Sequence, residues 1–133
     1  MTSMHLQVAP LQNPERYPLL AQALTDLAER WLGAARETTV VLIDDLPAAR
    51  WYVAGQPVDR PAVQLHVSLP AGQAGEGPKA EFIAQALTAL QRQLGRGEPL
   101  AVGSGVILRE LPPRHWGRCE ATAPQALGAG RFT

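Results

Sequence analysis

The residues of this chain that could do chemistry are an arginine and an acidic pair, each at the end of an apolar run. Arg109 follows Val-Ile-Leu, and its guanidinium group could bind an anion such as a carboxylate. It could equally be a solvated arginine at a strand end, paired with Glu110 or Asp45. Asp44 and Asp45 follow Val-Val-Leu-Ile, where two carboxylates could position a water molecule or form a solvated turn.

Three further candidates for a reactive centre have weaker patterns. His5, His66 and His115 show no metal-ligand spacing, so we expect neither a metal nor another cofactor. The glycine-rich stretch 71–77 is not followed by Lys-Ser or Lys-Thr, which argues against a phosphate-binding loop. Cys119 is the single cysteine, so we expect no intrachain disulfide and interpret it as a packing residue of a hairpin.

The overall charge and hydropathy exclude several classes of partner. The 133 residues carry 12 basic and 12 acidic side chains, which gives no reason to expect nucleic acid or an anionic membrane as partner. No apolar run approaches the roughly 18 residues that a membrane span needs. The first residues lack the basic and then apolar layout of a signal peptide. We therefore expect a soluble, cytoplasmic protein.

The chain contains an internal repeat, which must position these side chains. Residues 40–51 and 106–116 each contain an apolar run, an acidic residue, Leu-Pro, three residues and a tryptophan. Upstream of each copy, residues 21–25 and 84–88 share the letters Ala-Gln-Ala-Leu-Thr. Neither half could bury much apolar area alone, so we expect one domain. Its expected parts are two βαβ repeats at about 2–56 and 61–122, a linker at about 54–61 and a C-terminal tail at about 124–133.

Hydrophobic periodicity predicts the order β-α-β-β-α-β. Alternating or wholly apolar runs predict main strands at 4–8, 39–43, 63–67 and 106–108, with short hairpin strands at 51–53 and after Trp116. Helices are expected from about Tyr17 to Gly33 and from about Lys79 to Gly95. Their predicted apolar stripes are Leu20, Leu24, Leu27 and Trp31, and Ile83, Leu87, Leu90 and Leu94. The fold class is α+β built from α/β-type βαβ repeats, with a mainly parallel-paired, four-stranded sheet, both helices on one face and a pseudo-twofold relation between the halves.

This colinear series of features resembles the tautomerase superfamily, of the 4-oxalocrotonate tautomerase kind, with two βαβ units fused. The sharpest match is residues 61–67, Pro-Ala-Val-Gln-Leu-His-Val, which resemble the opening strand of the short family members. Leu-Thr in the helix, the apolar strand and the acidic-Leu-Pro turn before an aromatic residue resemble family sequences as well. The resemblance covers about residues 2 to 120.

The resemblance implies an isomerase that acts on a small unsaturated 2-oxo acid without a cofactor. In the family an N-terminal proline, exposed by removal of the initiator methionine, shuttles protons because a poorly solvated pocket disfavours its charged form. Arginines bind the substrate carboxylate, and an aromatic side chain on the hairpin lines the pocket. The implied partners are a small carboxylate-bearing molecule and two further copies of the chain in a homotrimer.

The chain departs from the family pattern at the catalytic position. A gapless alignment of the first half places Thr2 where the family has its proline. Thr2 could offer a primary amine as a base only if Met1 is removed. Pro61 matches the family proline too, but inside the chain its nitrogen belongs to an amide and cannot act as a base.

The expected substrate-binding residues are Arg109, Trp51 and Trp116. The family's strand arginine is replaced by Val40 and Gly105, and Arg109 lies four residues beyond Gly105 on the same strand face. Trp51 and Trp116 fall where the family has its pocket aromatic, and each could contact a ligand or pack within its hairpin.

Two alternatives to the isomerase remain open on this sequence. The missing proline and strand arginines favour a catalytically inactive binding or assembly subunit of the same fold. A hydratase or dehalogenase acting on a short unsaturated acid would instead use Asp44 or Asp45 to activate water.

Overall fold

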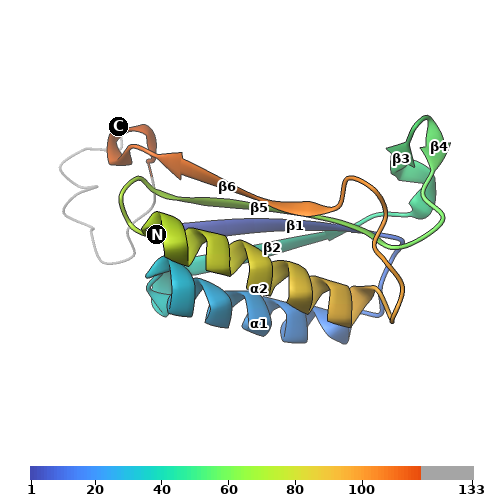
Figure 1. Cartoon of the computed structure of the whole chain (residues 1–133), viewed down its shortest axis with the longest axis horizontal. Coiled ribbons are helices and arrows are strands. Elements are labelled where there is room, and N and C mark those ends of the chain that lie inside the picture. The colour runs from blue at the N-terminus through green and yellow to red at the C-terminus, as the bar shows by residue number, and fades with distance from the viewer. Residues whose placement is uncertain (118–133) are drawn as a thin grey trace, which may run out of the picture.

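The chain folds into one four-stranded sheet with two helices packed side by side on one face (Figure 1). The computed structural model describes residues 1–117. Cys119, the second hairpin strand expected after Trp116 and the tail at about 124–133 lie outside the described residues. The described elements are β1 (Thr2–Ala9), α1 (Arg16–Leu32), η1 (Arg36–Thr38), β2 (Thr39–Asp45), η2 (Ala48–Arg50), β3 (Tyr52–Val53), β4 (Gln56–Pro57), β5 (Ala62–Pro70), α2 (Glu76–Leu94), β6 (Gly105–Leu111) and η3 (Pro113–His115).

The sheet has the strand order β2-β1-β5-β6. β1 pairs with β2 and β5 pairs with β6 in parallel, while the central pair, β1 and β5, is antiparallel. Each parallel pair is connected through a helix, which is the βαβ arrangement predicted from the sequence. Strands β3 and β4 form a separate two-stranded ribbon beyond one end of the sheet (Figure 1). The predicted α+β fold class, with two parallel pairs and both helices on one face, is confirmed.

An approximate twofold axis relates the two halves at the centre of the sheet. The antiparallel register places His5 opposite His66. On the outer strands, Leu42 lies beside His5 and Ile107 lies beside His66. Leu42 and Ile107 each lie nine residues before the tryptophan that ends the repeated motif.

The core lies between the sheet and the helices, where alternate residues of the central strands are wholly buried. These are Met4, Leu6 and Val8 of β1 and Val63, Leu65, Val67 and Leu69 of β5. They pack against Leu20, Leu24, Ala28 and Leu32 of α1 and Phe82, Ala86, Leu90 and Leu94 of α2. Because both central strands bury one full face, their alternating sequences follow directly from their place in the sheet.

The predicted apolar stripe of the second helix is partly wrong. Phe82 and Ala86 are fully buried, whereas Leu87 is 36 % exposed and Ile83 only partly buried. The pattern of large aliphatic residues therefore predicts a helix face that is rotated about the helix axis relative to the face that is buried. Ala86 is too small to stand out in a sequence pattern, but it lies directly between Phe82 and Leu90 on one side of the helix.

The element bounds also differ from the predictions at their ends. α1 begins at Arg16 and tolerates Pro18, because the first-turn N–H groups of a helix have no intrahelical partner. α2 begins at Glu76 rather than near Lys79, and Pro78 lies in its first turn for the same reason. The strands are longer than expected, at Thr2–Ala9, Thr39–Asp45, Ala62–Pro70 and Gly105–Leu111. Gly33 ends α1 as predicted, with a left-handed φ of 65°.

The face of the sheet turned away from the helices, called the open face below, is polar in the middle and apolar at its rims. Its rims include Val40 and Leu42 of β2 and Ile107 of β6, which are 45 %, 56 % and 48 % exposed. Its middle carries the polar alternate residues of the central strands, namely Ser3, His5, Gln7, Gln64, His66 and Ser68. Among the described residues, no helix has the length and apolarity that crossing a membrane requires.

Candidate functional site

A hollow of about 300 Å³ lies on the open face and has only polar lining residues. We call it the polar hollow; its lining residues are Ser3, His5, Gln7, His66, Ser68 and Arg109. Two adjacent cross-strand rows supply most of them. In one row Ser3 lies opposite Ser68, which lies beside Arg109, and in the next row His5 lies opposite His66. The hollow thus combines one guanidinium group, two hydroxyls, two imidazoles and one carboxamide.

Arg109 is exposed at the β6 side of the hollow and has no salt bridge within residues 1–117. The alternative pairing with Glu110 is not formed, because Glu110 lies 3.2 Å from the Nζ atom of Lys79. Lys79 also contacts Glu76 at 2.6 Å, and hydrogen bonds with Glu76 and then Glu110 raise the pKa of Lys79 above its usual 10.5. The carboxylate nearest to Arg109 in sequence is therefore engaged on the other side of the strand.

His5 is held in place by a carboxylate from the neighbouring strand. Its Nε2 atom lies 2.7 Å from the Oδ2 atom of Asp44 on β2. In the neutral ring, donation from Nε2 to this carboxylate leaves Nδ1 as the acceptor with a free lone pair. His66 has only a long contact of 3.5 Å to Gln64 on its own strand. The two facing histidines thus differ in how firmly they are oriented.

The contact between His5 and Asp44 is not evident from the sequence, because the two residues are 39 positions apart. The sequence pattern predicts only that Asp44 and Asp45 position a water molecule or form a solvated turn. Within the described residues, no three His, Cys, Asp or Glu side chains gather as a metal site would require. The signal that could have found the hollow is the alternation of polar residues along 3–7 and 64–68, which places them on one strand face.

The predicted site residues do not all lie at the same end of the sheet. The start of β1 and the C-terminal end of β6 lie at one end of the sheet, whereas β3 and β4 lie beyond the other (Figure 1). Arg109 is near the C-terminal end of β6, and Trp116 follows η3 shortly after that strand. Trp51 immediately precedes β3 and packs beside a small cluster of Ala9, Val58, Ala62 and Ala101. The structure therefore places Arg109 and Trp116 at the end of the sheet where β1 begins. Trp51 lies at the opposite end and packs beside the hairpin. Trp116 is half-buried and caps η3.

Thr2 is fully buried, and its side chain belongs to the helix-facing side of β1. Its Oγ1 atom accepts a hydrogen bond of 3.2 Å from Gln73, which also donates to the carbonyl of Leu32 at 2.9 Å. The role of Thr2 as a catalytic amine stays a prediction.

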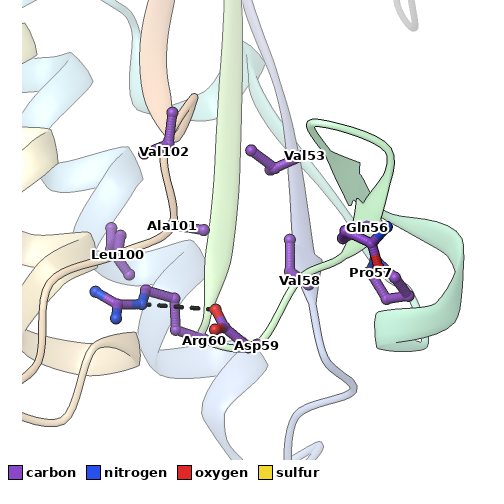
Figure 2. A pocket seen from close by; sticks show the side chains of 9 residues that line it. All are labelled: Val53, Gln56, Pro57, Val58, Asp59, Arg60, Leu100, Ala101 and Val102. Carbon is purple, nitrogen blue, oxygen red and sulfur yellow. Dashed lines mark ion pairs between the residues drawn. The ribbon is translucent and has the colours of Figure 1, made fainter.

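A second cavity, of about 420 Å³, lies at the opposite end of the sheet (Figure 2). It is lined by Val53 and residues 56–60 of the ribbon and linker and by residues 100–102 before β6. Its ionisable lining residues are Asp59 and Arg60, which lie 3.8 Å apart, and the Asp59 side chain is 89 % exposed. Pro61 follows, and its carbonyl accepts a hydrogen bond of 2.7 Å from Ala101. Although larger, this cavity lacks an oriented acid or base among its lining residues.

Comparisons with known proteins agree with this architecture. The family described as "Tautomerase enzyme" matches residues 5–60. No curated protein sequence matches the chain. A wild-type fused 4-OT, solved as a symmetric trimer, is 25 % identical, covers 97 % of this chain and 99 % of its own, and has a TM-score of 0.73.

Two more distant structures share the fold. A structure described as Pt0534 inactivated by 2-oxo-3-pentynoate is 19 % identical, covers 95 % of this chain and 98 % of its own, and has a TM-score of 0.77. The macrophage migration inhibitory factor of Toxoplasma gondii is 14 % identical, covers 89 % of this chain and 96 % of its own, and has a TM-score of 0.69.

Proposed function

Because the chain belongs to the tautomerase superfamily, we propose that it is an isomerase that moves a proton within a small unsaturated 2-oxo acid. The observation that carries the proposal is the polar hollow, which places Arg109 and two imidazole rings on one exposed surface. Asp44 orients one of these rings, that of His5. One neighbour in fold is described as inactivated by 2-oxo-3-pentynoate, itself a small unsaturated 2-oxo acid. This likeness supports the choice of substrate class.

Arg109 would bind the substrate carboxylate. A guanidinium group offers two parallel N–H donors that match the two oxygens of a carboxylate, and the charge strengthens both hydrogen bonds. The hydroxyls of Ser3 and Ser68 lie in the same cross-strand row and can donate to the carboxylate or to the neighbouring keto oxygen. The positive charge also stabilises the negative charge that develops on an enolate.

The N-terminal amine is the base that the sequence suggests for this reaction. It requires removal of Met1, which would leave the amine of Thr2 at the start of β1. Mass spectrometry of the intact purified protein measures this directly. Retention of Met1 would exclude the Thr2 amine as the base.

Turnover of phenylpyruvate tests the isomerase proposal. Conversion of the enol form into the keto form is followed by the loss of enol absorbance, with the spontaneous reaction in the same buffer as reference. A rate above the spontaneous one, proportional to enzyme concentration, is the expected result. No excess rate at micromolar enzyme would contradict the proposal.

The main alternative is a binding or assembly subunit that has lost catalysis. It is favoured by the burial of Thr2, whose hydroxyl accepts a hydrogen bond from Gln73. Such a protein would bind a 2-oxo acid near Arg109 without converting it. A hydratase or dehalogenase is a further alternative, in which Asp44 would direct a water molecule; its carboxylate already accepts a hydrogen bond from His5.

A further inference from the structure

We infer that His5, oriented by Asp44, is the proton-transferring residue of the polar hollow. The inference rests on the proposed isomerase function and supplies it with a base that needs no free N-terminal amine. His5 would act as the catalytic residue, and Asp44 as the positioning residue that fixes the ring.

The contact between the two side chains defines which ring nitrogen is available. Asp44 lies 2.7 Å from Nε2, so the neutral ring carries its proton there and exposes the Nδ1 lone pair. When Nδ1 takes a proton, the resulting imidazolium ion is stabilised by the negative charge of Asp44 across the same contact. His66 shows no such carboxylate partner among the described residues, which is why the assignment falls on His5.

The geometry of the sheet allows one small molecule to contact both His5 and Arg109. The two residues lie two strands and two residues apart on the same face. With about 4.8 Å between strands and about 3.3 Å per residue, their Cα atoms are about 12 Å apart. An extended arginine, a small 2-oxo acid and an imidazole ring together span such a distance. Both side chains line the same hollow.

The proton transfer then balances without any other reactant. Nδ1 of His5 takes a proton from C3 of the bound 2-oxo acid, and the electron pair of the broken C–H bond forms the C2–C3 double bond. The electrons of the keto group move onto its oxygen, where Arg109 and the serine hydroxyls stabilise the charge. His5 returns the proton to this oxygen and gives the enol; the reverse sequence gives the ketone.

Among residues 1–117, the ionisable side chains that share the open face with His5 and lie near it are those of Asp44 on β2, His66 on β5 and Arg109 on β6. A general base acts only in its unprotonated form, so the profile of kcat/KM against pH should show an acidic limb in the wild type. This acidic limb should be absent from the residual activity of a variant that lacks the imidazole.

Kinetics of three variants test the inference. H5Q should lower kcat for phenylpyruvate by about 10²- to 10⁴-fold, the usual contribution of a general acid–base group, with little change in KM. D44N keeps an acceptor but loses the charge, so it should give a smaller loss of kcat and an altered acidic limb. H115Q changes the exposed histidine of η3 and should match the wild type. A wild-type kcat in folded H5Q, with its circular dichroism unchanged, would overturn the inference.

A chemical label separates failure of this inference from failure of the proposed function. The amine or imidazole nitrogen of the pocket should add to the alkyne of 2-oxo-3-pentynoate and increase the mass of the chain by that of the whole reagent. Peptide mapping should place the adduct on His5, even in a preparation without turnover. An adduct on the N-terminal amine, or no adduct, would overturn the role of His5. Active enzyme labelled only at the N-terminus would leave the isomerase proposal standing.

Discussion

At the scale of single residues, we propose that substrate binding depends on Arg109. It is the only Lys or Arg among the described residues that line the polar hollow. We expect R109L to raise KM for phenylpyruvate by about 10- to 100-fold, because a hydrogen bond to a charged group contributes about 1.5–3 kcal/mol and each 1.4 kcal/mol is a factor of ten. The measurement is a comparison of KM and kcat between R109L and the wild type.

A matched control separates this effect from a change in overall charge. Arg50 is an exposed arginine of η2, next to Trp51 at the other end of the sheet. R50L should leave KM unchanged. An equal rise of KM in both variants would show that Arg109 acts through general electrostatics and not through contact with the carboxylate.

The sequence could place Arg109 on its strand face but could not assemble the rest of the hollow. Counting four residues from Gly105 along one strand is a local argument, and the register confirms that both residues lie on the open face. His5 and Asp44 are 39 residues apart, and only the parallel register of β1 and β2 brings them into contact. Trp51 was expected beside the ligand because the family position was known, but the end of the sheet that it occupies depends on topology.

At the scale of elements, the second helix shows where hydrophobic pattern and packing disagree. The pattern of large aliphatic residues predicted Leu87 as a core residue, whereas Phe82 and Ala86 are buried. F82A should lower the free energy of unfolding by about 3–5 kcal/mol, because it removes a fully buried ring and leaves a cavity. L87A should change it by no more than about 1 kcal/mol, because that side chain is partly exposed.

Urea denaturation of both variants measures this difference. The two residues lie on the same helix and are both replaced by the strong helix former alanine, so helix propensity does not account for a difference between them. Equal destabilisation by both changes would show that the helix is rotated relative to the structure. The central strands needed no such correction, since period-two alternation in 3–8 and 63–69 agrees with the buried residues.

At the scale of the whole molecule, the open face has the features of a surface that another chain covers. Its rims expose the apolar side chains of Val40, Leu42 and Ile107, and the strands that carry them, β2 and β6, are the two edge strands of the sheet. Several structures of the same fold are described as trimers. We propose that three copies of this chain associate through these rims. In such a trimer, the polar hollow on the open face of each chain would be enclosed and poor in water.

Light scattering of the eluting protein tests the trimer. The expected mass is three times the chain mass of 14.3 kDa. The double variant L42K/I107K should elute as a smaller species, because it places charges on both rims. L19K, which changes a leucine that is 63 % exposed on α1, should remain trimeric. A monodisperse wild-type monomer would contradict the proposed assembly.

The fold class could be predicted from the sequence more completely than the assembly or the site. The repeat of strand, helix and strand is evident in the sequence, because each half contains the same apolar run and Leu-Pro turn. The antiparallel joining of the halves, with His5 opposite His66, was not visible, because it depends on contacts between residues 61 positions apart. The polar hollow is a product of that joining, and so it could not be predicted before the register was known.

Exchange of the C3 protons of phenylpyruvate in D₂O tests most directly whether the polar hollow transfers protons. Proton NMR follows the loss of the C3 signal with wild-type protein, with R109L and with buffer alone. We predict that the wild type accelerates exchange above the buffer rate and that R109L loses most of the acceleration at substrate concentrations below KM. Exchange at the buffer rate in the presence of wild-type protein would contradict proton transfer in the hollow.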